Sequence, residues 1–357
     1  MEEAKRIAEE IYDELRYKHQ NQKNLSAASF RKVAADFIRK VERETTEGRL
    51  SKGRRNLIVG TVDRYLNPFF GRFFITEIRS AHFAEYDEWR LDYWTVGYGA
   101  ERQVYRKAEV PSQKTLVMEQ GILRQVFKHA VERGWLSAVP FMQSKSAKTN
   151  RRSAFDIHEY KLLMRVMLRR IRETRHPRVQ HDRALLALYV RLMSNTGMRV
   201  GEARHLKWGD IEIVTLSSNG KSNEVLRIWV DGKTGKRALI GTTVAKYIIQ
   251  RLLKFYEYGS LQEARDSGGY LFVKTSGELV QTFEVGFKRL LEACGLETDR
   301  YGKNRTLYSL RHTYATYRLL YGGVDVYLLA RNMGTSVQMI ERHYGHVTTS
   351  LAADKLL

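Results

Sequence analysis

Three short segments in the second half of the chain contain residue types that suit chemistry on a phosphate ester. Arg199 lies in the run TGMRVGEARHL, two residues after a helix-breaking glycine. Arg311 lies in the run YSLRHTYAT, and Tyr344 lies near the C-terminus in the run IERHYGH. The two arginines and the tyrosine are therefore candidates for a single site, although more than a hundred positions separate the first from the others.

Phosphodiester transfer concentrates negative charge on two non-bridging oxygens, and planar guanidinium groups bind such oxygens in a bidentate manner while staying charged at any working pH. Each charge-assisted hydrogen bond of this kind is worth about 1.5–3 kcal/mol. A phenol, with a pKa of about 10, becomes a useful nucleophile when its proton is removed or its anion is stabilised by nearby cations. Arg199, Arg311 and Tyr344 fit these roles.

The segments resemble the sequence boxes of the tyrosine recombinases, or phage integrases. The first box of that family looks like Thr-Gly-x-Arg-x-x-Glu-x-x-x-Leu, the second like His-x-Leu-Arg-His-(Ser/Thr)-x-Ala-Thr, and the last pairs a Gly-containing turn with the nucleophile. The matching residues are Thr196, Gly197, Arg199, Glu202 and Leu206, then Leu310, Arg311, His312, Thr313, Ala315 and Thr316, then Gly334 and Tyr344. The resemblance covers roughly residues 25 to 350, and the order of the boxes makes it specific.

The resemblance implies a role for each residue. Tyr344 would attack a phosphate held by Arg199 and Arg311 and form a 3′-phosphotyrosine, which keeps the bond energy, so that strands rejoin without metal, cofactor or ATP. Lys233, in the run DGKTGK, has the hairpin context of the family's lysine and would protonate the departing 5′-oxygen. Glu202 would support Arg199.

Two positions depart from the family pattern. Tyr308 stands where the second box usually begins with His, and Thr335 stands where the turn before the nucleophile usually has His or Trp. Both can donate hydrogen bonds to phosphate oxygens, but neither titrates near neutrality, so general-base assistance, typically about 10²–10⁴-fold, is in question. His312 and His343 lie close in sequence and are the candidates to substitute.

Each of the central residues also has a plainer interpretation. Arg199 could form only a structural salt bridge with Glu202, and Arg311 could be bound in the same way. Tyr344 is one of twenty tyrosines, most of which must belong to the core or the surface.

Three further patterns bear on these assignments. Lys221 and Lys236 also lie on predicted turns and compete with Lys233 for its role. The GKS run that contains Lys221 is no phosphate-binding P-loop, because the first glycine is missing and the context is not strand-to-helix. His343 and His346 have no companion ligands nearby, so a metal site is not expected.

The elements that must position these residues fall into two parts. We expect a helical extension over 1–24, a helical core-binding bundle (SAM-like) over 25–140, a basic linker over 141–153 and a catalytic domain over 154–357 that is mainly helical with a small antiparallel sheet. By resemblance the two domains form a C-shaped DNA clamp. The predicted helices cover 2–17, 27–41 with Ser26 as N-cap, 51–66 ending before Pro68, 76–93, 112–133, 183–195, 242–258, 282–293 and 309–320.

Short strands are predicted at 211–214, 225–230 and 237–240, with Asn219–Gly220 and Asp231–Gly232 as turn dipeptides between them. These strands would place Lys233 beside a tight turn.

Composition supports a polyanionic partner. Sixty-one Lys and Arg against 40 Asp and Glu give a net charge of +21, and such an excess favours binding to nucleic acid through counterion release. A single cysteine, Cys294, excludes an intrachain disulfide, and neither a signal-like N-terminus nor an apolar run of membrane length is present. A cytoplasmic protein associated with the nucleoid is expected.

The sequence therefore predicts a site-specific DNA recombinase or integrase, acting as a homo-tetramer on double-stranded DNA with paired sites, with accessory DNA-bending or directionality factors as further partners. Two alternatives stay open. The chain could be a catalytically attenuated or inactive DNA-binding protein on the same scaffold, or a relaxing topoisomerase of the type IB kind, which shares the chemistry.

Overall fold

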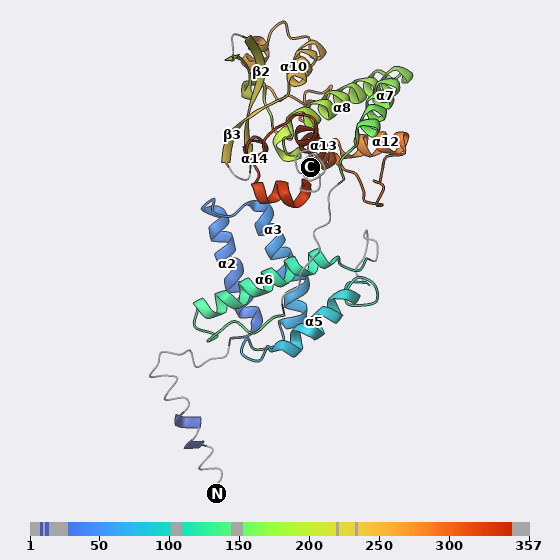
Figure 1. Cartoon of the computed structure of the whole chain (residues 1–357). Helices are drawn as coiled ribbons and strands as arrows, with labels where there is room; N and C mark the ends of the chain where they lie inside the picture. The colour runs from blue at the N-terminus through green and yellow to red at the C-terminus, as the bar shows by residue number, and fades with distance from the viewer. Residues whose placement is uncertain are drawn as a thin grey trace, which may run out of the picture. The chain divides into compact units, whose positions relative to one another are not determined.

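The computed structural model describes residues 8–9, 11–13, 28–100, 109–143, 153–218, 221–232 and 235–344. The chain divides into two compact units, Met1–Thr149 and Asn150–Leu357. Figure 1 shows the helices of both units and the sheet of the second. Most of the expected extension and of the expected linker lies outside the described residues.

The first unit is a helical bundle around an aromatic core. Phe30 and Phe127 are fully buried there, with ring centroids 6.4 Å apart. The expected cap Ser26 lies outside the described residues, and the helix is capped instead by Ser29, whose side chain accepts a hydrogen bond from Lys32 N at 3.3 Å. The described elements are α2 (Phe30–Thr46), α3 (Lys52–Thr61), the π-helical turn η1 (Val62–Leu66), α4 (Asn67–Phe70), α5 (Ser80–Asp92) and α6 (Gln113–Glu132).

The prediction that the helix after residue 51 ends before Pro68 is wrong. The backbone stays helical from α3 through η1 into α4, where Pro68 occupies the first turn. The N–H of Asn67 donates to Val62 O, five residues earlier. In a regular α-helix the proline ring would clash with the carbonyl four residues back, and the wider π-turn moves that carbonyl out of line.

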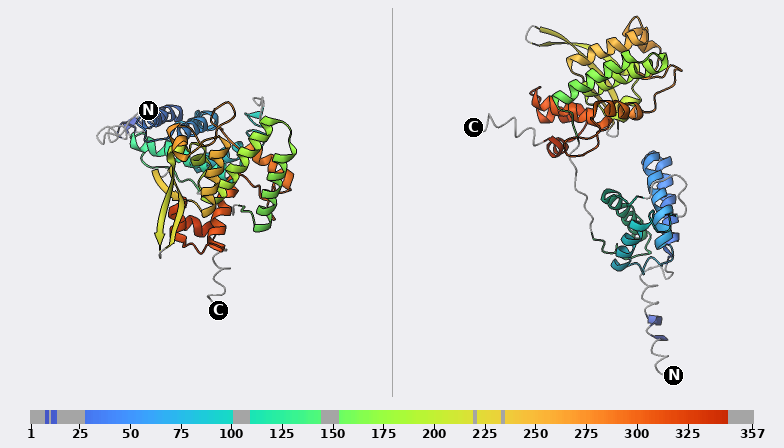
Figure 2. Two further views of the ribbon diagram at one scale, coloured as in Figure 1. Left: turned by 90° about the horizontal axis from the view of Figure 1, so that it is seen from above. Right: turned by 90° about the vertical axis from the view of Figure 1, so that its right-hand side faces the viewer.

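The second unit is built around α8 (Pro177–Thr196). Its residues 185–190 are all buried, as expected of a helix that is surrounded by other elements, and Figure 2 shows α10 beside it. The other elements are α7 (Ile157–Glu173), α9 (Val200–Arg204), the 3-10 turn η3 (Trp208–Asp210), β1 (Ile211–Ser218), β2 (Lys221–Gly232), β3 (Gly235–Ile240), α10 (Thr243–Phe255), α11 (Leu261–Asp266), α12 (Glu284–Cys294), α13 (Leu307–Leu320) and α14 (Val326–Met333). A last helical stretch covers 337–344.

The three strands form one antiparallel sheet in the order β1-β2-β3. Asp231 and Gly232, predicted as a turn, belong to β2 and pair with Lys236 and Gly235. The connection between β2 and β3 is therefore the pair 233–234, which lies outside the described residues. The predicted fold class, mainly helical with a small antiparallel sheet, is confirmed.

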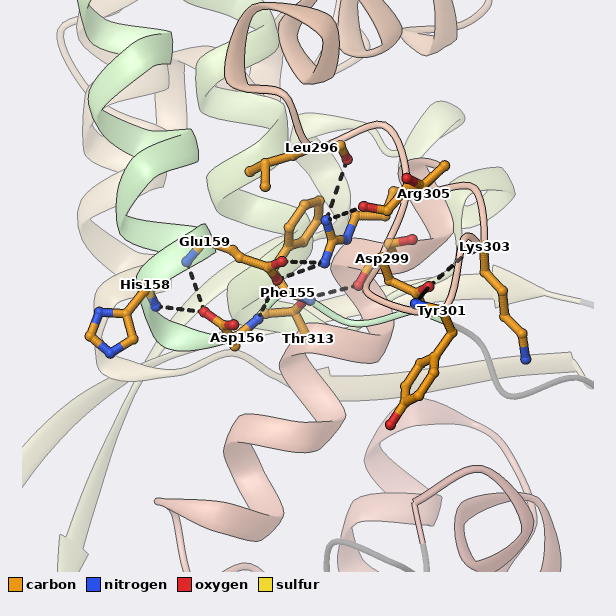
Figure 3. Close-up of polar contacts among 12 residues, drawn as sticks. Phe155, Asp156, His158, Glu159, Leu296, Asp299, Tyr301, Lys303, Arg305 and Thr313 are labelled. Carbon is orange, nitrogen blue, oxygen red and sulfur yellow. Dashed lines mark hydrogen bonds and ion pairs between the residues drawn. The ribbon is translucent and has the colours of Figure 1, made fainter.

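A polar junction fixes the start of the second unit to α13 (Figure 3). Phe155 N donates to the hydroxyl of Thr313 at 2.9 Å, and that hydroxyl donates to Ser309 O at 2.9 Å. Beside it, both carboxylate oxygens of Glu159 accept hydrogen bonds from Nη2 of the buried Arg305, each at 2.6 Å. The chain thus enters the unit on the helix that carries Arg311.

Candidate active site

The C-terminal end of α8 directs the chain into the site. Gly197 ends the helix with a φ of +63°, a left-handed conformation that favours glycine. A Cβ at this position would overlap the ring of Tyr314. The turn delivers Arg199 to the N-cap position of α9, where its backbone N–H donates to Glu202 Oε2 at 2.8 Å.

Glu202 is the only carboxylate that the described residues place between two of the site's guanidinium groups. Its Oε1 accepts from Arg199 Nη1 at 2.6 Å and from Arg237 Nη1 at 2.7 Å, and its Oε2 accepts from Arg237 Nη2 at 2.9 Å. Burial works to raise the pKa of Glu202, but the hydrogen bonds from Arg237 and Arg199 outweigh it and lower the pKa. Glu202 is therefore ionised and orients Arg199.

The C-terminal end of α14 gathers three guanidinium groups. Met333 O accepts from Arg311 Nη2 at 2.9 Å and from Arg237 Nη2 at 3.1 Å, and Gly334 O accepts from Arg199 Nη2. The last carbonyls of a helix carry partial negative charge and have no partner within the helix. Arg199 and Arg311, 112 positions apart in the sequence, thus donate to adjacent carbonyl groups.

Arg311 is buried, with 4% of its surface exposed. Its two outer nitrogens donate to carbonyl oxygens, Nη1 to Gly197 O at 2.6 Å and Nη2 to Met333 O. No described carboxylate lies within ion-pair distance of it. Burial lowers the pKa of Arg311, and the charge of Arg199 acts in the same direction. A guanidinium remains charged at neutral pH even so, and Arg311 is therefore a buried cation without a paired anion among the described residues.

Tyr344 lies against the same helix. Its hydroxyl forms a hydrogen bond with Nδ1 of His312, the residue that follows Arg311, and both side chains are buried. Their ring centroids are 5.5 Å apart. Tyr344 packs in a small cluster with Leu329 and Met333, which attaches the 337–344 helix to α13 and α14. The phenol, the imidazole and the buried guanidinium are thereby brought together.

Of the remaining predicted site residues, the structure describes Tyr308, His343 and Thr335 but not Lys233. Tyr308 is half-buried one turn before His312, with ring centroids 5.3 Å apart, and the ring of His343 lies 5.9 Å from that of His312. Thr335 is half-buried just after α14, and its backbone N–H donates to Ala330 O at 2.9 Å. Lys233 lies outside the described residues, directly after Gly232, the last paired residue of β2.

Arg237 is the residue that sequence reasoning missed, since position 237 was seen only as the start of a strand. The alternation of inward and outward side chains along the strand contained a signal for this residue. Arg237 shares a face of β3 with the fully buried Leu239, and a charged residue on an inward face requires a buried partner.

Two features are absent from the described ranges. No group of three or more His, Cys, Asp or Glu is placed to hold a metal ion there. No helix among the same residues is long and apolar enough to cross a membrane.

Comparison with known proteins decides the family. The model of the phage integrase family matches residues 156–350, which include every residue of the site described above. The chain belongs to the phage integrase family. Its match to this family covers α7 through the nucleophile candidate, and the order of the boxes along the chain follows from that membership.

The chain spans less than half the length of the curated relative that it matches. It is 25% identical over 175 residues to the tyrosine recombinase XerC of Caldanaerobacter subterraneus subsp. tengcongensis, a match that spans 49% of this chain and only 43% of that relative.

Two solved structures share the fold. The integrase of the Tn1549 transposon in complex with transposon right end DNA superposes with a TM-score of 0.60 at 16% identity, over 92% of this chain and 99% of that one. A lambda integrase tetramer bound to a Holliday junction superposes with a TM-score of 0.57 at 16% identity, over 85% and 77%.

Proposed function

We propose that this protein is a site-specific DNA recombinase that cuts and rejoins DNA strands through a 3′-phosphotyrosine at Tyr344. The observation that carries the proposal is the state of Arg311, a buried cation that forms no ion pair with the described residues. An unpaired buried charge is costly, so the site favours an anion. A phosphodiester is an anion of fitting charge that Tyr344 can attack.

In the proposed reaction each of these side chains has one role. His312, neutral and unprotonated at Nδ1, takes the phenol proton while Tyr344 Oη forms a bond to phosphorus. The bond from phosphorus to the 5′-oxygen breaks, and Lys233 supplies the proton that this oxygen gains. Arg199 and Arg311 bind the non-bridging oxygens, where charge accumulates in the transition state, and Tyr308 and Thr335 add neutral donors. Reversal with the 5′-hydroxyl of another strand rejoins the DNA.

We assign the DNA-grasping role to the helical residues 25–140 and the chemistry to residues 154–357, joined by the basic segment 141–153. The partner is double-stranded DNA with paired sites, and the working assembly is a homo-tetramer. The net charge of +21 supports a DNA partner. The lambda integrase structure, which shares this fold, is a tetramer on a Holliday junction. Accessory DNA-bending or directionality factors belong to the same proposal.

The residues after Tyr344 are assigned to assembly, as a segment that docks on a neighbouring subunit. Deleting 347–357 is expected to abolish paired-site complexes on native gels while the affinity for a single site stays within about threefold, because the deletion weakens subunit association and leaves the DNA-binding surface of each subunit intact. Full assembly by the truncated chain would contradict this role.

A non-catalytic DNA-binding protein is the second candidate, because Tyr308 and Thr335 replace the family's usual histidine and histidine or tryptophan. The test uses a pool of random-sequence duplexes with a nick in one strand, so that cleavage releases a short fragment and traps the protein on DNA. Detergent-stable adducts are recovered and sequenced, which also yields the preferred duplex.

The wild-type chain should form such adducts and Tyr344→Phe should not. DNA binding without adducts would establish the non-catalytic candidate. Adducts that show no sequence preference, together with relaxation of supercoiled DNA by a monomer, would instead establish a topoisomerase of the type IB kind.

A further inference from the structure

Arg237 connects three parts of the catalytic unit that are far apart in the chain. From β3 it donates to both carboxylate oxygens of Glu202, at 2.7 and 2.9 Å, and to Met333 O at 3.1 Å. Glu202 precedes it by 35 positions and Met333 follows it by 96. Only 14% of its side chain is exposed, so these interactions are screened little by solvent.

The acceptors that Arg237 uses are the same groups that orient the two phosphate-binding candidates. Glu202 Oε1 also accepts from Arg199 Nη1, and Met333 O also accepts from Arg311 Nη2. Arg237 therefore shares one acceptor with each arginine, and removal of its guanidinium would free both acceptors to move.

The packing around Arg237 leaves little room for adjustment. Gly334 has a φ of +62°, and a Cβ there would lie 2.5 Å from the Arg237 guanidinium carbon. A Cβ on Gly232, across the hairpin, would lie 2.5 Å from Glu202 Oε1. Because neither glycine has a Cβ, both β2 and α14 can approach the ion pair of Arg237 and Glu202 closely. Figure 1 shows α14 beside β3.

The position of Arg237 on the hairpin adds a second link. It pairs with Val230 in the register of β2 and β3, and the ladder ends two pairs further on at Gly232 and Gly235. The same ion pair that fixes Glu202 therefore holds the hairpin of β2 and β3 two pairs before its last described pair.

We propose that Arg237 is a positioning residue of the recombinase site. By holding Glu202 and the last carbonyls of α14 in place, it aims Arg199 and Arg311 at one phosphate. The inference rests on the proposed function, since it assigns a role within that reaction.

The experiment compares Arg237→Gln and Arg237→Lys with the wild-type full-length chain, using the duplex recovered from the nicked pool. Single-turnover cleavage by Arg237→Gln should fall by about 10²-fold, the usual cost of disordering one preorganised donor, while its affinity for the uncleaved duplex stays close to wild type and its melting temperature, lowered by the loss of a buried ion pair, stays above the assay temperature. Arg237→Lys should remain at least about tenfold slow, because an ammonium cannot hold a carboxylate in bidentate fashion. The matched control is Arg227→Gln, which removes a more exposed arginine of β2 that pairs with Glu212 at 3.5 Å.

A second substrate separates positioning from general stability. In a duplex with a methylphosphonate at the cleaved position, the phosphate is neutral and the two arginines have less charge to stabilise. The rate difference between Arg237→Gln and wild type should then shrink to less than about threefold. Wild-type cleavage by Arg237→Gln would overturn the inference, and so would an undiminished deficit on the neutral substrate. A wild-type chain that forms no adduct would overturn the proposed function, and the inference with it.

Discussion

The hydroxyl of Tyr344 forms a hydrogen bond with Nδ1 of His312, and His312 follows Arg311 directly on α13. The proposed nucleophile, its proton acceptor and one phosphate-binding group are therefore attached to one another within a single chain. The family pattern that this sequence resembles has a further histidine at position 308, where this chain has Tyr308. The hydrogen bond with His312 provides a titratable group beside the phenol in spite of that departure.

His312→Asn should slow covalent adduct formation by about 10²–10³-fold, because the amide can accept a hydrogen bond but cannot take the proton. Single-turnover rates on the nicked duplex measure this loss. His205→Asn, at an exposed histidine of the same unit, is the control, and a wild-type rate in His312→Asn would assign the proton transfer to another group.

Tyr308→Phe and Thr335→Val should each cost about tenfold in the cleavage rate. Each substitution removes one neutral donor, and a hydrogen bond to a charged acceptor is worth about 1.5–3 kcal/mol before compensation by water. Arg311→Ala should cost at least about 10³-fold, because it removes a buried, preorganised charge. The same single-turnover assay ranks the three variants. A deficit for Tyr308→Phe as large as that for Arg311→Ala would show that Tyr308 acts in proton transfer.

Mixing Tyr344→Phe protein with Arg311→Ala protein should not restore adduct formation. Because Tyr344 is buried against His312 of its own chain, each mixed assembly contains only subunits that lack either the nucleophile or the phosphate-binding group. The measurement is the yield of detergent-stable adduct on paired sites at several mixing ratios. Adducts that peak near equal amounts of the two proteins would demonstrate that one subunit donates its tyrosine to another.

The first unit should become less stable in acid through Asp36. Burial raises the pKa of this carboxyl, but hydrogen bonds from Arg39, His129 and Arg133 outweigh it and lower the pKa from 3.8 to about 2. The folded-state pKa lies below the unfolded one, so the stabilisation is complete above about pH 4 and disappears as the pH falls toward 2.

Asp36→Asn should therefore lower the free energy of unfolding at neutral pH by about 1–2 kcal/mol, and the deficit relative to wild type should vanish between pH 4 and 2. Hydrogen exchange of the α2 and α6 amides reports on this unit alone. Asp63→Asn, at an exposed aspartate, should leave exchange unchanged, and a deficit that persists at pH 2 would contradict the assignment.

Local sequence patterns correctly predicted those helices and strands that interactions between neighbouring residues determine. The helix expected over 112–133 is α6 (Gln113–Glu132), because a serine cap and a long apolar periodicity act together there. The three predicted strands lie within β1, β2 and β3, since each is a short, mostly apolar run and turn dipeptides separate the runs. The family boxes, which match short runs of consecutive residues between Thr196 and Tyr344, lie within residues 156–350, the range that the family model matches.

The misses have two origins. The helix α7 was not predicted although its sequence contains the local signals, since Asp156 and Glu159 form a capping box and Leu163, Val166 and Met167 lie on one buried face. The other misses depend on the folded backbone. The helical path through Pro68 depends on a π-turn that local propensity does not favour. The alternation with Leu239 places Arg237 on the inward face of its strand, but its partners Glu202 and Met333 lie far away in the sequence and are brought to it only by the folded backbone.

One hydroxyl group, that of Thr313, connects the first described residues after the linker with the helix of Arg311 and His312. The path of the chain into the second unit is therefore tied to the helix that carries Arg311 and His312, and Thr313→Val would remove this tie with the loss of a single oxygen atom.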